Sequence, residues 1–72
     1  MRYIAVFPTL TLAQKAERAL RNENIAANVT KVDSTRTRRG CSWGVIFDES
    51  AIYNVRMIFS NRGIAEREII KG

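Results

Sequence analysis

The chain has 72 residues, one cysteine, no histidine and a formal net charge of +5, from 12 Lys and Arg against 7 Asp and Glu. This length predicts a single domain over residues 1–72, which buries only about 60% of its unfolded surface. One cysteine excludes an internal disulfide, and a lone thiol without histidine excludes a structural zinc site. The missing histidine also excludes a Ser–His or Cys–His catalytic pair within one chain.

Hydrophobic residues make up 46% of the chain and charged residues 26%, as is typical of a soluble globular protein. No apolar run approaches the roughly 18 residues of a membrane span, so no membrane partner is expected. Pro8 interrupts the apolar start of the chain, which favours a buried strand over a signal peptide. We therefore expect a cytoplasmic protein whose thiol stays reduced.

Residues 3–7 are apolar and β-prone and predict a first strand. Thr9 or Thr11 can cap the helix that follows, and Thr11 with Gln14 fits a capping box. Apolar residues recur there at steps of three and four, which predicts an amphipathic helix: Leu12, Ala13, Ala16, Ala19 and Leu20. The polar side of this helix carries Lys15, Arg18 and Arg21, a pattern typical of a solvated face. Asn24 tolerates the left-handed conformation that ends a helix.

A second strand completes the order strand-helix-strand, which the rest of the chain repeats. Residues 25–32 and 43–47 predict strands, and residues 33–40 between them predict a polar loop. Asp48 is a good cap for a second amphipathic helix, whose apolar stripe consists of Ala51, Ile52, Val55, Ile58 and Phe59. Gly63 supplies its left-handed stop before a last strand, which is predicted over residues 64–70.

An internal echo supports a twofold repeat. Residues 22–26 (NENIA) resemble residues 61–65 (NRGIA), 39 positions later, and Phe7 and Phe47 are 40 positions apart. Each half predicts one helix packed on a pair of strands. The sequence therefore predicts an α+β fold, a ferredoxin-like βαββαβ sandwich with a four-stranded antiparallel sheet and two helices on one face.

One face of such a sheet stays open. Alternation along the first strand predicts that Ile4 and Val6 face the helices, which leaves Tyr3, Ala5 and Phe7 outside. For the third strand the alternation does not identify the core face. One of its two assignments gives an open face with four aromatic residues, Tyr3, Phe7, Trp43 and Phe47. Such a surface would serve as a homodimer interface or a base-stacking platform.

The chemistry-bearing feature is Cys41, which follows Gly40 at the end of a basic loop. The loop carries Arg36, Arg38 and Arg39, and nearby guanidinium groups favour the reactive thiolate form of a cysteine. No other soft nucleophile is present in the chain. The alternative is an inert cysteine buried in the core, as many free cysteines are.

Other motifs are weaker. Residues 39–46 fit the RNA-recognition signature loosely, but Cys41 stands where the first stacking aromatic belongs, so nucleic acid is a disfavoured partner. The basic loop would then contact phosphates without sequence preference, or simply be solvated. The paired carboxylates Asp48/Glu49 and Glu66/Glu68 are explained by a helix start and a strand edge.

Over nearly its full length the chain resembles the selenium/sulfur carrier protein-like family of small domains with a single Gly-Cys motif. The resemblance rests on residues 3–9, 15–17, 47–48 and 62–64, on the loop with Arg36, and on Gly40-Cys41. It implies that Cys41, at the head of the third strand, carries sulfur or selenium as a persulfide or perselenide. Loop proline and a glycine after the cysteine are common in the family, whereas this loop lacks proline and Ser42-Trp43 follow Cys41.

Two hypotheses result. In the first, the chain is not an enzyme and needs no cofactor or metal, and Cys41 exchanges sulfur or selenium with donor and acceptor proteins while the loop arginines and Gly40 assist. In the second, it is a non-catalytic interaction module, dimeric or RNA-contacting, that uses the open aromatic face and the basic loop.

Overall fold

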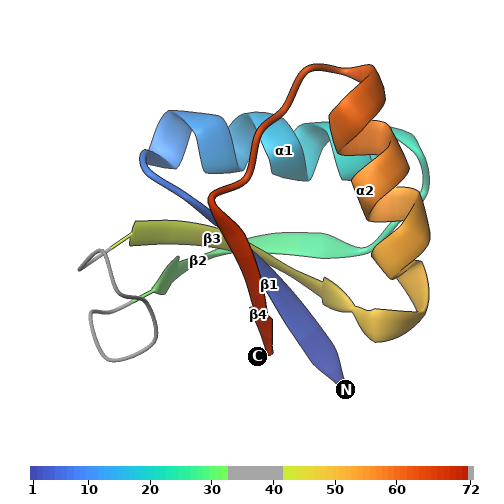
Figure 1. Ribbon diagram of the computed structural model, residues 1–72, viewed down its shortest axis with the longest axis horizontal. Helices are drawn as coiled ribbons and strands as arrows, with labels where there is room; N and C mark the ends of the chain where they lie inside the picture. Colours follow the sequence, from blue (N-terminus) through green and yellow to red (C-terminus); the bar gives the residue numbers. More distant parts are fainter. Residues whose placement is uncertain (33–41, 72) are drawn as a thin grey trace.

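A computed structural model describes residues 1–32 and 42–71. Within these residues the chain forms four strands, two α-helices and one short 3-10 helix (Figure 1). In chain order these are β1 (Arg2–Phe7), α1 (Leu10–Asn22), β2 (Ala27–Val32), β3 (Ser42–Asp48), η1 (Glu49–Ala51), α2 (Ile52–Asn61) and β4 (Glu68–Lys71).

The four strands form one antiparallel sheet in the order β2-β3-β1-β4. Both α-helices lie on the same side of this sheet (Figure 1). The predicted α+β class, with a four-stranded antiparallel sheet and two helices, is confirmed. No helix in the described ranges is long and apolar enough to cross a membrane.

Both predicted helices form, but the start of α1 differs from the capping box. Thr9 is the N-cap, and its hydroxyl accepts a hydrogen bond from the backbone N–H of Leu12 at 3.2 Å. Thr11 lies inside the helix, so the Thr11–Gln14 capping box is wrong. Thr9 takes this role because its extended backbone, with φ −134° and ψ 156°, directs the hydroxyl at the first turn.

Asp48 ends β3 and caps the helical segment after it. Its carboxylate accepts hydrogen bonds from the backbone N–H and the hydroxyl of Ser50. These two bonds, the hydroxyl bond first, hold the pKa of the Asp48 carboxyl below its ordinary value. The predicted cap at Asp48 is confirmed, although a 3-10 turn separates it from α2.

The sequence echo corresponds to matching helix ends. The backbone N–H of Ile25 donates to the carbonyl of Leu20 at 3.0 Å, and that of Ile64 donates to the carbonyl of Phe59 at 2.8 Å. Before each isoleucine stands a left-handed residue, Asn24 with φ 63° or Gly63 with φ 66°. Both ends therefore have the 6→1 hydrogen bond of a Schellman motif, 39 positions apart.

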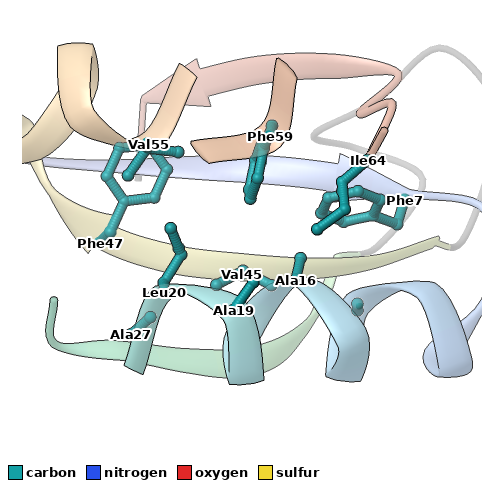
Figure 2. Packing of buried hydrophobic residues seen from close by; sticks show 12 residues of the cluster. Phe7, Ala16, Ala19, Leu20, Ala27, Val45, Phe47, Val55, Phe59 and Ile64 are labelled. Carbon is teal, nitrogen blue, oxygen red and sulfur yellow. The ribbon is translucent and has the colours of Figure 1, made fainter. Parts of the chain in front are cut away.

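The main cluster fills the space between the sheet and the two helices (Figure 2). It consists of Ala5, Phe7, Ala13, Ala16, Ala19, Leu20, Ala27, Val45, Phe47, Val55, Phe59 and Ile64. Phe7 and Phe59 meet edge to face, with ring centroids 5.8 Å apart. Such aromatic pairs add to the stabilisation that area burial provides.

The predicted facing of β1 is therefore wrong. Ala5 and Phe7 face the helices, whereas Ile4 and Val6 belong to a separate cluster on the other side of the sheet. All four side chains are at most 1% exposed. A central strand that is buried on both faces has no polar side, so alternation could not indicate which face meets the helices.

The predicted open face with four aromatic residues is wrong for the same reason. Phe7 and Phe47 are buried in the main cluster, and the half-buried Tyr3 and Trp43 pack against it. These are the large rings that fill the gap between sheet and helices. The opposite face instead carries an aliphatic cluster of Ile4, Val6 and Val32, flanked by the half-buried Ile46 and Ile70.

Two strand boundaries also differ from prediction. β2 begins at Ala27 rather than residue 25, because Ile25 completes the end of α1. β4 begins at Glu68 rather than residue 64, because Ile64 completes the end of α2 in the same way. The predicted loop over residues 33–40 lies outside the described residues.

Gly44 allows the aliphatic cluster to close over β3. A Cβ at this position would lie 2.5 Å from Cγ2 of Ile4 and 2.9 Å from Cγ2 of Val32. We expect Gly44→Ala to lower the free energy of unfolding by about 1–3 kcal/mol through overpacking, as measured by urea denaturation. In an Ile4→Ala background the added cost should shrink, and an undiminished cost would contradict a steric origin.

The lowered pKa of Asp48 predicts an acid-dependent loss of stability. Because the folded pKa lies below the unfolded value of about 3.9, the contribution is complete above that value and disappears as the pH falls through the folded pKa. The difference in melting temperature between the natural chain and Asp48→Asn should be constant above about pH 5 and shrink in stronger acid. A difference that does not change with pH would show that the charge of Asp48 contributes nothing to the cap.

Candidate functional site

The predicted thiol, Cys41, stands in the sequence between the end of β2 and the start of β3. Val32, the last residue of β2, pairs with Ser42, the first residue of β3. Cys41 directly precedes Ser42 in the chain. Cys41 itself lies outside the described residues, as do its predicted helpers Arg36, Arg38, Arg39 and Gly40. The described part of the site is therefore the head of β3 and its neighbours.

Ser42 is the first described residue after the cysteine. Its side chain is 2% exposed, and its hydroxyl oxygen is buried without a hydrogen-bond partner in the described part of the chain. It lies on the face of the sheet that carries Val32 and Gly44, away from the helices. A buried hydroxyl that is not hydrogen-bonded is costly, which makes Ser42 a functional candidate that the sequence did not single out.

Trp43 occupies the opposite face of β3. It is paired with Phe7 on β1 and Lys31 on β2, and its half-buried ring packs against the main cluster. The indole is therefore held on the helix side of the sheet, whereas Ser42 faces the other side. The predicted aromatic group is brought together only within the core, where the Tyr3 and Phe47 centroids are 6.2 Å apart.

The predicted structural roles of the carboxylates are partly confirmed. Asp48 caps η1, and Glu49 lies 3.9 Å from the N-terminal ammonium group. Glu68 lies on the edge strand β4 and pairs with Val6 of β1, but Glu66 precedes β4, and its Oε2 atom is buried without a partner among the described residues. Both glutamates are half-buried, so the exposed strand edge predicted for this pair is wrong. Within residues 1–32 and 42–71, no group of three or more His, Cys, Asp or Glu side chains could hold a metal ion.

A groove lies elsewhere, between α1 and the segment that follows α2. This groove has a volume of about 550 Å³. We refer to it as the basic groove, and its described lining is Thr11, Gln14, Lys15, Arg18, Ala19, Asn22, Arg62 and Ile64. The sequence placed Lys15 and Arg18 on a polar helix face, but nothing in it indicated that Arg62 lies beside them.

The basic residues of α1 divide into two kinds. Arg21 is committed to the fold, because it donates to the carbonyl of Ala27 and to Oδ1 of Asn28 and lies 3.9 Å from Glu17. Glu17 in turn accepts from the backbone N–H of Val29 at 3.0 Å. These contacts bind α1 to β2. Lys15 and Arg18 are exposed and make no ion pair within the described residues.

Comparison of the chain with protein-family models, with curated proteins and with solved structures finds no match.

Removal of the Ser42 hydroxyl tests whether it is unpaired in the folded protein. We expect Ser42→Ala to leave the free energy of unfolding unchanged or raise it by up to about 1 kcal/mol, because the hydroxyl has no hydrogen-bond partner among the described residues. Thr9→Ala is the matched control and should lower it by about 1 kcal/mol, since that hydroxyl caps α1. Chemical denaturation measures both, and equal losses would show that Ser42 has a partner.

Proposed function

We propose that this chain is a sulfur or selenium carrier of ferredoxin-like fold, with Cys41 as the carrier thiol. The observation that carries the proposal is that Cys41 directly precedes Ser42 in the sequence, and that Ser42 is the first residue of β3, where it pairs with Val32 of β2. The resemblance to the selenium/sulfur carrier protein-like family requires a cysteine at the head of the third strand.

The strand order supports the ferredoxin-like assignment. The βαββαβ element order, the β2-β3-β1-β4 sheet and the helices on one face are the arrangement expected of two packed split βαβ halves. The matching ends of α1 and α2 fit the same twofold repeat.

The proposed transfer conserves atoms and electrons. The Cys41 thiol first loses its proton to solvent, and the thiolate attacks the terminal sulfur of a persulfide on the donor protein. A new S–S bond forms at Cys41, the S–S bond of the donor breaks, and the donor cysteine leaves as a thiolate. The same exchange at an acceptor thiol returns Cys41 to its starting form, and a perselenide follows the same sequence. No external oxidant or reductant is consumed.

The single cysteine and the loop arginines are compatible with a carrier role. The chain has no second cysteine that could attack the persulfide and release the sulfur as an internal disulfide is formed. Arg36, Arg38 and Arg39 would stabilise the anionic thiolate and persulfide by charge and hydrogen bonding. Trp43 lies on the helix side of β3, where it contributes to the core rather than to the opposite face that Ser42 occupies. The chain in this role is a substrate of other enzymes and not an enzyme itself.

Incubation with a small persulfide donor tests the carrier role. The natural chain should gain the mass of one sulfur atom, reversibly on addition of a reducing thiol, while Cys41→Ser should gain none. Intact mass spectrometry measures both, and circular dichroism checks that the variant keeps its fold. A chain that acquires no sulfur unless it is first denatured would contradict the proposal.

A second experiment tests whether the loop arginines activate the Cys41 thiol. If they favour the thiolate, Arg38→Ala with Arg39→Ala should slow alkylation of Cys41 by iodoacetamide at pH 7. Arg2→Ala with Arg56→Ala removes the same charge elsewhere and should leave the rate nearly unchanged. Equal slowing in both variants would indicate an effect of net charge alone.

A further inference from the structure

The basic groove is built by two segments that are far apart in the sequence. Arg18 and Ala19 come from α1, while Arg62 and Ile64 follow the end of α2. Figure 1 shows the segment after α2 passing beside α1 on its way to β4. Ala19 and Ile64 are 4% and 8% exposed and form an apolar floor. The described floor of the groove therefore belongs to the folded core.

The groove is positively charged. Lys15, Arg18 and Arg62 line it, and none of the described lining residues is acidic. Lys15 and Arg18 make no ion pair within the described residues, while Arg62 approaches Glu23 at 3.4 Å in an exposed pair. Exposed ion pairs contribute little free energy, so Arg62 can exchange Glu23 for another anion. The groove thus offers three cationic side chains to one ligand.

The uncharged residues of the groove favour a peptide over a nucleic acid. Gln14 and Asn22 each present an amide that can donate and accept, which matches the alternating N–H and C=O groups of an extended peptide. No aromatic side chain is among the described lining residues, whereas single-stranded nucleic acids are held largely by stacking on aromatic rings. The apolar floor can receive one aliphatic side chain.

The length of the groove also fits a short extended peptide. The groove follows α1 from Thr11 to Asn22, a rise of about 16 Å at 1.5 Å per residue. An extended peptide of about five residues spans the same length. The Thr11 end lies near the point where β1 gives way to α1, and there Phe7 is paired with Trp43 near the head of β3.

We propose that the basic groove docks an acidic, extended peptide segment of a partner protein. Its carboxylates pair with Lys15, Arg18 and Arg62, its backbone hydrogen-bonds to Gln14 and Asn22, and one aliphatic side chain rests on Ala19 and Ile64. This docking does not depend on Cys41, so it stands or falls separately from the carrier function.

Fluorescence anisotropy with a labelled Glu-Glu-Leu-Glu-Glu peptide tests the proposal. Lys15→Glu with Arg18→Glu should weaken binding by about tenfold or more, because two attractive pairs become repulsive. Arg56→Glu with Arg2→Glu is the matched control, since it makes the same charge change outside the groove and should alter the affinity less than about twofold. Thermal melts of each variant confirm that the fold is retained.

Three further arms separate the alternatives. Gln14→Ala with Asn22→Ala should also weaken binding, without any change in charge. Cys41→Ser should bind the peptide as the natural chain does, even if it accepts no sulfur. The proposal is overturned if the peptide does not bind, if the control reversals weaken it equally, or if a labelled five-nucleotide RNA competes for the groove with higher affinity.

Discussion

The burial of β1 on both of its faces is the constraint on which the rest of the fold depends. β1 pairs with β3 on one side and β4 on the other, so it has no free edge. Ala5 and Phe7 lie under the helices, while Ile4 and Val6 form the aliphatic cluster with Val32. A chain of this length has few such positions, and four consecutive residues that are almost wholly buried supply much of its hydrophobic stabilisation.

The two helices end in the same type of turn, which directs the chain back to the sheet. Each ends in a Schellman motif whose last isoleucine turns back toward the sheet, at Ile25 and at Ile64. Ile64 then enters the main cluster, and Ile25 packs against it. The end of α2 also carries Arg62, which the repeat places next to Glu23 at the end of α1. The same turn that closes the core thus also brings a cation from the second half of the chain to a groove along the first helix.

Two candidate sites follow from this arrangement, and they differ in how they are built. The head of β3 has a buried Ser42 hydroxyl with no hydrogen-bond partner among residues 1–32 and 42–71, and Cys41 directly precedes it in the sequence. The basic groove is a surface feature, with an apolar floor supplied by the core and exposed charged side chains above it. In the proposed carrier role, chemistry at the first and recognition at the second are compatible, because such a protein must both hold its cargo and select its partners.

Local patterns in the amino-acid sequence were sufficient for the order of the elements, both left-handed helix ends and the Asp48 cap, because each depends on neighbours within a few residues. They also identified Cys41 as the only soft nucleophile, which is a matter of composition. They failed for the facing of β1 and for the aromatic residues, because an apolar central strand satisfies either orientation and only the packing of Phe7 against Phe59 selects one. The basic groove could not be predicted from the sequence either. Arg62 is more than forty residues from Lys15 and Arg18 in the sequence, and the three meet because the segment after α2 folds back beside α1.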